Sequence, residues 1–147
     1  MKSAIIYYSK HHGNTKKLID AIKEKNEVDL FDVTSERPLL EDYDLIGFAS
    51  GIYYSAFNKN LMEYIAENLP ENKDVFLIAT CGAKPGENFF KGPRELIESK
   101  GSRIKGTYIC NGFDTFGPFK LVGGIKKGHP TAEEINGAVT FYETLIK

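Results

Sequence analysis

The residues best suited to chemistry lie near the N-terminus, in a polar turn between an apolar segment and an amphipathic one. Ser9, Asn14 and Thr15 bring side-chain hydrogen-bonding groups to this turn, and Gly13 lets the backbone bend close to a ligand. A turn from a strand into a helix also gathers the free N–H groups of the first helical turn at one point, which suits an anion. We therefore predict a phosphate-binding loop. The alternative is an ordinary connection in which Asn14 or Thr15 caps the helix.

Two later loops carry residues that suit a planar ligand. The segment 50–57 offers Gly51 beside Tyr53 and Tyr54, and the segment 81–86 is rich in glycine. Because ligands of open α/β sheets bind beyond the carboxyl ends of the strands, we expect these loops to converge on the first turn. A phosphate anchor beside aromatic rings predicts a phosphorylated planar ligand. The alternative for both tyrosines is packing in the core or at the surface.

Apolar strands alternate with amphipathic helices along residues 1–147, with no repeat or linker between them, so we expect a single domain. This alternation predicts a parallel sheet covered by helices on both faces. The second expected strand mixes polar and apolar residues and therefore suits an edge. The expected strands are 3–8, 28–33, 43–49, 74–80 and 103–110. The expected helices are 15–25, 58–68, one that ends at Lys100-Gly101, and one that follows a capping box at 131–134.

Composition narrows the classes of function. The formal net charge is −1, with 19 basic and 20 acidic residues, which argues against a nucleic-acid binder. No apolar run approaches the roughly 20 residues that span a bilayer, so no membrane insertion is expected. The strand-like N-terminus lacks a signal-peptide pattern, which favours a cytoplasmic protein. Cys81 and Cys110 match no metal-binding spacing, so both are expected to be free buried thiols and no metal site is predicted.

The segment 111–129 is long and rich in glycine, and it carries Phe113, Phe116 and Phe119. Loops of this length inside a compact domain are uncommon and often functional. Two interpretations stay open. The rings pin the loop to the core, or the loop forms a lid or a docking surface.

These motifs, in this order and spacing, resemble the flavodoxin family, which binds FMN noncovalently. The segment 8–15 resembles the phosphate loop of that family, Ser50-Gly51-Ile52-Tyr53 stands at the place of its first isoalloxazine loop, and Cys81-Gly82 opens a likeness of the second. The likeness extends over essentially the whole chain. It implies a flavodoxin-like three-layer α/β sandwich with a five-stranded parallel sheet in the order 2-1-3-4-5.

The resemblance also assigns roles to residues. The first turn would hold the FMN phosphate, Tyr53 or Tyr54 would stack on the flavin, and the backbone of the third loop would meet its pyrimidine edge. The peptide at Gly51 could flip at little cost and offer its carbonyl to the N–H of a reduced flavin. The predicted cofactor-binding residues are Ser9, Lys10, His11, His12, Gly13, Asn14, Thr15, Ser50, Gly51, Ile52, Tyr53, Tyr54, Cys81, Gly82, Ala83 and Phe89. No catalytic residue is predicted.

Some positions depart from the family pattern. His11-His12 stand where hydroxyl residues and a Thr-Gly pair are usual, and they either donate to the phosphate or are solvated. Pro85-Gly86 stand near the place of a second stacking aromatic, so either Phe89 substitutes or one flavin face is bare. Ala83 replaces a frequent acidic residue.

Charge near the expected site differs from the family pattern as well. Lys10, Lys59 and Lys84 lie close to the motifs in sequence. By Coulomb's law they make the reduced flavin anion less unfavourable, which predicts a less negative potential than is usual for the family.

The leading hypothesis is an FMN-binding electron carrier that serves redox partner proteins. Two alternatives stay open, an FMN-dependent NAD(P)H or quinone oxidoreductase and a flavin-free interaction domain. A phosphorylation receiver domain has a similar sheet but needs acidic residues after the first and third strands. Ser9 and Ser50-Gly51 occupy those places, which disfavours this reading.

Overall fold

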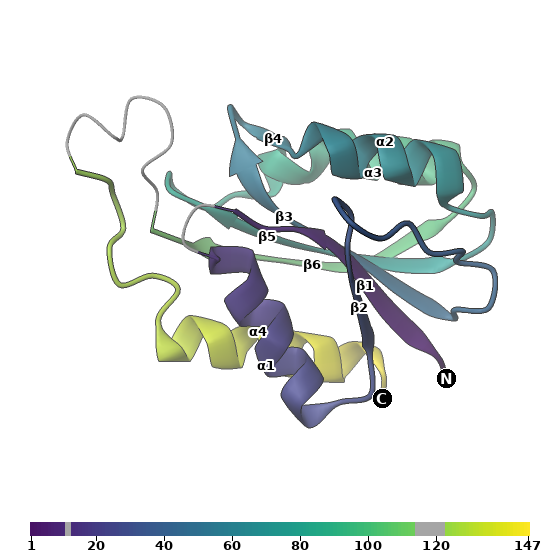
Figure 1. The fold of residues 1–147 in the computed structure, drawn as a ribbon, viewed down its shortest axis with the longest axis horizontal. Helices are drawn as coiled ribbons and strands as arrows, with labels where there is room; N and C mark the ends of the chain where they lie inside the picture. Colours follow the sequence, from purple (N-terminus) through teal and green to yellow (C-terminus); the bar gives the residue numbers. More distant parts are fainter. Residues whose placement is uncertain (11–12, 114–122) are drawn as a thin grey trace.

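The protein is built on a central parallel sheet with helices on both faces (Figure 1). The computed structural model describes residues 1–10, 13–113 and 123–147. The strands are β1 (Ser3–Tyr8), β2 (Asp29–Asp32), β3 (Leu45–Tyr53), β4 (Ala56–Phe57), β5 (Asp74–Cys81) and β6 (Arg103–Asn111). The helices are α1 (Asn14–Lys25), α2 (Lys59–Asn68), α3 (Lys91–Ser99) and α4 (Ala132–Leu145), with a short 3₁₀ helix, η1 (Glu87–Phe90), before α3.

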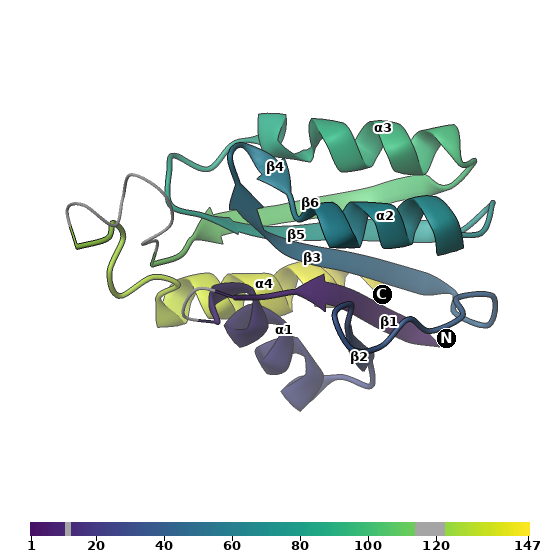
Figure 2. The same ribbon diagram turned by 45° about the horizontal axis from the view of Figure 1, so that its top comes forward.

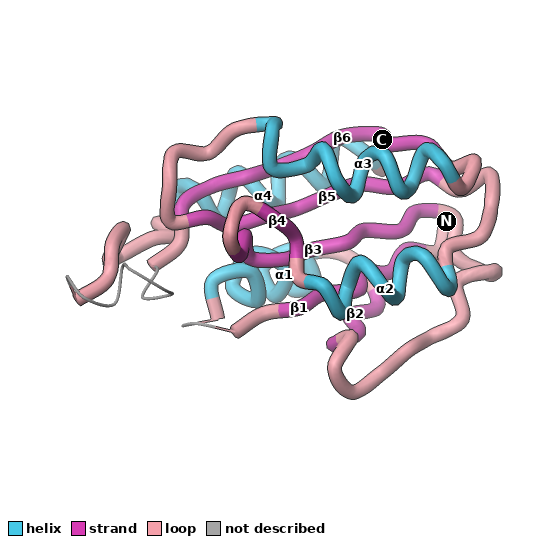
Figure 3. Tube along the Cα trace, turned by 90° about the horizontal axis from the view of Figure 1, so that it is seen from above, coloured by secondary structure: helices cyan, strands magenta, loops and turns pink. Residues whose placement is uncertain are grey.

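The strand order β2-β1-β3-β5-β6 confirms the predicted fold. The fourth and fifth strands expected from the sequence are β5 and β6, because the short β4 lies off this path and pairs only with β3. Helices α1 and α4 cover one face of the sheet, and α2 and α3 lie side by side on the other (Figures 2 and 3). The polar β2 lies at the edge, as predicted.

Burial on both faces explains the continuous apolar runs. Ile5 and Ile6 are neighbours in β1 and both are fully buried, yet their side chains belong to different cores. Ile5 packs with residues of α1 and α4, and Ile6 packs with residues of α2 and α3. Alternation of side chains along a strand produces this division, so a strand between two helical layers needs apolar residues at every position.

The segment 50–57 was expected to be a loop, and this prediction is wrong. Strand β3 continues to Tyr53 and then pairs with β4 in an antiparallel hairpin (Figure 2). The two turn residues, Tyr54 and Ser55, have φ angles of 49° and 66°. Such turns usually contain Asn or Gly, which adopt positive φ easily, and the Tyr-Ser pair gives no such signal in the sequence.

Helix α4 begins with the predicted capping box. Thr131 Oγ1 accepts a hydrogen bond from the Glu134 backbone N–H, and the Glu134 carboxylate accepts one from Thr131 N–H. Glu134 Oε1 also lies 2.6 Å from His129 Nδ1, and Glu134 Oε2 accepts from the backbone N–H of Asn111 at 3.4 Å. Burial acts to raise the pKa of this carboxyl group, but its hydrogen bonds and His129 outweigh burial and hold the pKa below its ordinary value.

Both cysteines are free and buried, as predicted. Burial raises the pKa of the Cys110 thiol to about 12, so this group is unreactive at neutral pH. No helix in the described ranges is long and apolar enough to span a bilayer.

The close packing of β3 on β5 depends on Gly47. A Cβ atom at this position would overlap the ring of Phe76, which is fully buried. We expect Gly47→Ala to lower the free energy of unfolding by about 1–3 kcal/mol, because overpacking forces neighbours from their rotamers. Urea unfolding measures the change. Gly92→Ala is the control, since its Cβ would lie 3.8 Å from Met62 Cε. Equal midpoints for Gly47→Ala and the wild type would contradict the prediction.

The contacts of Glu134 predict how stability responds to acid. Because its pKa in the folded protein is lowered from 4.5, its contribution is complete above about pH 4.5 and is lost as the pH falls through the folded-state pKa. Glu134→Gln should therefore lose less stability than the wild type between pH 7 and pH 3, as measured by urea unfolding at each pH. Glu133→Gln, an exposed neighbour on the same helix, is the matched control. A Glu134→Gln curve parallel to that of the wild type would disprove this role of the carboxylate.

Candidate functional site

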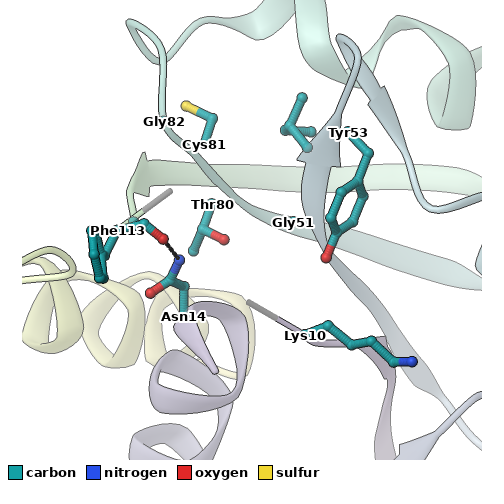
Figure 4. Close-up of a pocket in the computed structure, with 10 residues that line it drawn as sticks. Lys10, Asn14, Gly51, Tyr53, Thr80, Cys81, Gly82 and Phe113 are labelled. Carbon is teal, nitrogen blue, oxygen red and sulfur yellow. Dashed lines mark hydrogen bonds between the residues drawn. The ribbon is translucent and has the colours of Figure 1, made fainter. Parts of the chain in front are cut away.

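A pocket opens beyond the carboxyl ends of the parallel strands, where the turns after β1, β5 and β6 meet the end of β3 (Figure 4). The predicted convergence of three loops is therefore present, and the end of β6 adds a fourth segment. The residues that line the pocket are Lys10, Asn14, Gly51, Ile52, Tyr53, Thr80, Cys81, Gly82, Gly112 and Phe113.

The N-terminus of α1 forms one side of this pocket. Gly13 is the N-cap residue with φ 65°, a left-handed conformation that suits glycine, and it has no side chain with which to cap the helix. Capping by Asn14 or Thr15, the alternative interpretation of this turn, is therefore wrong. Thr15 Oγ1 instead lies 3.0 Å from Thr80 Oγ1 in a buried contact that ties the helix to β5.

Part of the first helical turn is already paired within the protein. The N–H of Lys16 donates to Ser9 Oγ at 3.2 Å, so the predicted Ser9 supports the turn through its hydroxyl oxygen. The N–H of Lys17 donates to the Gly13 carbonyl. Among the described residues no acceptor is found for the backbone N–H groups of Asn14 and Thr15. N–H groups at this position, at the positive end of the helix dipole, are suited to an anionic ligand.

Asn14 is the most informative side chain of the site. It is 8% exposed, its Nδ2 donates to the carbonyl of Phe113 at 2.7 Å, and its Oδ1 is buried with no hydrogen-bond partner among the residues that the structure describes. A carbonyl oxygen can only accept a hydrogen bond, so the Asn14 atom that contacts the Phe113 carbonyl must be the amide nitrogen. The other terminal atom of the Asn14 side chain is therefore the oxygen. A buried acceptor left unpaired costs about 1–3 kcal/mol, so Oδ1 calls for a donor from outside the described chain.

Gly51 and Tyr53 line the pocket from β3. The Tyr53 ring lies over Gly51, because a Cβ there would be 3.0 Å from Tyr53 Oη. The same ring meets Tyr8 edge-on, with centroids 5.8 Å apart. Ser50 is fully buried behind the pocket, where its hydroxyl donates to the Gly51 carbonyl and accepts from the N–H of Asn58.

Several predicted residues lie elsewhere. Tyr54 is 79% exposed and lines a second groove, which shares Tyr53 with the pocket and also includes Tyr8 and Lys59. Phe89 lines another groove under the β3–β4 hairpin, and Ala83 is exposed and absent from the pocket lining. His11 and His12 lie outside the described residues, as do Phe116 and Phe119 of the long loop.

Sequence reasoning missed four contributors to the pocket. Thr80 and Phe113 hold the first helix through the contacts described above, and Gly112 makes room for Asn14, which a Cβ at this position would overlap. The fourth, Asn111, holds the Cys81 loop from the end of β6. The position of residues 111–113 in the sequence could have indicated this role. They directly follow a predicted strand and therefore lie at the same edge of the sheet as the other loops of the site.

The charge around the pocket favours an anion. Lys10 lies in its lining, with its Nζ 6.0 Å from the centroid of the Tyr8 ring, and no carboxylate is found among the lining residues that the structure describes. Lys16 is paired with Asp20 at 2.7 Å on the flank of α1. Within the described ranges no cluster of side chains could hold a metal ion.

Comparisons with solved structures agree with the fold. Over 99% of this chain and 97% of the other, the structure is similar to oxidised flavodoxin 1 from Bacillus cereus, with a TM-score of 0.69 and 15% identity. It is similar over 99% of both chains to a flavodoxin from the domain Archaea, with a TM-score of 0.66 and 14% identity. It is also similar over all of both chains to Fusobacterium nucleatum flavodoxin bound to flavin mononucleotide, with a TM-score of 0.64 and 14% identity.

Sequence comparison gives the family. An uncharacterized protein of Methanocaldococcus jannaschii is 36% identical over 149 residues, which cover 100% of this chain and 99% of the relative. The family description that matches residues 5–102 is the flavodoxin domain. Because that match covers more than half of a chain of 147 residues, and because the fold agrees, this protein belongs to the flavodoxin domain family.

Proposed function

We propose that this protein binds FMN noncovalently in the pocket and carries electrons between redox partner proteins. The observation that carries the proposal is the buried Oδ1 of Asn14, which has no hydrogen-bond partner within the described ranges, beside the N-terminus of α1. One turn thus combines donors for an anion with an acceptor for a hydroxyl group. FMN joins a phosphate to a chain of hydroxyl groups and matches this combination.

The need for a hydroxyl argues against phosphate alone. A phosphate dianion offers only acceptors, which suit the N–H groups of Asn14 and Thr15 but leave Asn14 Oδ1 unpaired. The ribityl chain of FMN carries hydroxyl donors next to its phosphate. Lys10, in the same lining, adds attraction for the negative group.

The far side of the pocket suits a flat ring. Gly51 and Gly82 present backbone without side chains, and Tyr53 offers an aromatic surface between them and Tyr8. A bound flavin would supply the ability to accept and donate electrons. The protein's part would be to orient the ring, exclude water from it, and set the charge around it.

The carrier function is favoured over an enzyme with its own substrate. The described lining contains no histidine or carboxylate that could act as a general acid or base. Electron transfer between proteins needs no such group, whereas reduction of a quinone needs protons as well as electrons.

FMN titration tests the cofactor. We expect the flavin-free protein to bind one FMN, with quenching of flavin fluorescence, and to bind riboflavin at least about tenfold more weakly because riboflavin lacks the phosphate. Asn14→Ala should weaken FMN binding by about tenfold, through loss of the hydroxyl acceptor and of the bond to Phe113. Asn26→Ala, at the opposite end of α1, is the matched control and should bind as the wild type does. A wild-type protein that ignores FMN would refute the cofactor.

Steady-state turnover tests the carrier function. The FMN-loaded protein should oxidise NADH or NADPH only slowly with a quinone as acceptor, and should turn over once a partner reductase is added. Absorbance at 340 nm follows the reaction. Rapid turnover without any partner protein would favour the oxidoreductase instead.

A further inference from the structure

The loop that follows β5 is held from the end of β6 by the side chain of Asn111 and by a backbone N–H. Asn111, the last residue of β6, donates through Nδ2 to the carbonyl of Cys81 at 3.0 Å and to the carbonyl of Ala83 at 2.7 Å. The N–H of Gly112 also donates to the Cys81 carbonyl, at 3.0 Å. Both loop carbonyls therefore accept hydrogen bonds from the end of β6, and the Ala83 carbonyl accepts a further one from Cys81 Sγ at 3.3 Å.

This arrangement determines where the loop's N–H groups point. In a trans peptide unit the carbonyl and the following N–H are directed to opposite sides. In the described part of the chain the peptide bond between His129 and Pro130 is the cis bond, so the units after Cys81 and Ala83 are trans. The Gly82 N–H consequently points away from β6 and toward β3. The pocket lies on that side, between Gly82 and the residues Gly51 and Tyr53 (Figure 4).

Asn111 is itself held in place by residues at the start of α4. Its backbone N–H donates to Glu134 Oε2, and Glu134 is fixed by the capping box of α4 and by His129. The side chain that sets the loop is thus anchored on a strand and on the start of a helix, which are rigid elements.

We propose that Asn111 is a positioning residue for the cofactor. Together with the Gly112 N–H it holds the Cys81 carbonyl toward β6, so that the Gly82 N–H of the same peptide unit is presented to the acceptor edge of the flavin ring, and it fixes the loop further through the Ala83 carbonyl. This inference rests on the proposed function. A donor at that edge binds the ring more tightly when the ring carries more negative charge. Asn111 therefore strengthens binding of the reduced flavin more than of the oxidised flavin, and raises the midpoint potential.

Two substitutions separate this role from simple packing. Asn111→Asp keeps the size of the side chain but replaces the donor by an oxygen that faces two carbonyl oxygens, and Asn111→Ala removes the group. Asn68→Asp and Asn68→Ala are matched controls, because Asn68 Nδ2 also donates to a carbonyl, that of Tyr64, within α2 and away from the pocket.

We expect both Asn111 variants to bind oxidised FMN several-fold more weakly and reduced FMN about tenfold more weakly still. That further tenfold corresponds to a two-electron midpoint potential lower by about 30 mV. Affinity for inorganic phosphate alone should not change, since the start of α1 is untouched. The Asn68 variants should match the wild type in all three measurements. Unchanged potentials in Asn111 variants that bind FMN would overturn the proposal and leave the FMN function intact.

The flavin-free protein provides a readout that does not depend on FMN. The Gly82 amide resonance and the carbonyl carbon resonances of Cys81 and Ala83 should shift in both Asn111 variants and not in the Asn68 variants. If the wild type fails to bind FMN, the proposed function fails, and these resonances still show whether Asn111 sets the loop. Spectra of this loop that do not change in the Asn111 variants would disprove the positioning role.

Discussion

The site depends on the hydrogen bond between Asn14 and Phe113, which joins the first helix to the segment after the last strand. This bond holds the Asn14 amide in one orientation, in which its buried Oδ1 has no partner in the part of the chain that the structure describes. It also requires Gly112, because any side chain there would displace Asn14. A buried group without a partner is unfavourable in the empty protein, and binding of a hydroxyl donor relieves that penalty. The protein is therefore expected to be more stable with such a ligand bound than without it.

The electrostatic features of the two ends of the pocket have the same sign. The start of α1 and Lys10 stand at one end, where the proposed FMN would place its phosphate, and Gly82 of the loop after β5 stands at the other, where the flavin ring would lie. A helix N-terminus and a backbone N–H donor both favour negative charge, so with the proposed FMN bound the pocket would attract the phosphate and would also stabilise a ring that has gained electrons. The sequence indicated this direction through Lys10 and Ala83. The structure adds a cause that the sequence did not contain, since the inward N–H depends on a contact between two strands.

The sequence predicted those features of the fold that depend on residues close together in the chain. Continuous apolar runs identified strands buried on both faces, and the Thr131–Glu134 spacing identified the start of α4. The β3–β4 hairpin was not predicted, because its turn has Tyr54 and Ser55 at positive φ, where glycine or asparagine is usual. The contribution of Asn111 and Phe113 to the site was not predicted for another reason. Their contacts with the Cys81 loop and with Asn14 cross between segments far apart in the chain, and nothing in a single sequence records which partners meet.

The hairpin also changes how Gly51 can act. A glycine peptide flips easily by itself, but here the Gly51 carbonyl accepts a hydrogen bond from the buried hydroxyl of Ser50, and Ser50 in turn accepts from Asn58 at the start of α2. A flip that offered this carbonyl to a ligand would break a bond worth about 1 kcal/mol. A Cβ at position 51 would lie 3.0 Å from Tyr53 Oη, so a larger residue would require this ring to shift. The Gly51 peptide can therefore flip, but the hydrogen bond from Ser50 opposes the flip. A ligand must bind the flipped peptide more tightly than the unflipped one by at least the free energy of that hydrogen bond for the flip to be favoured.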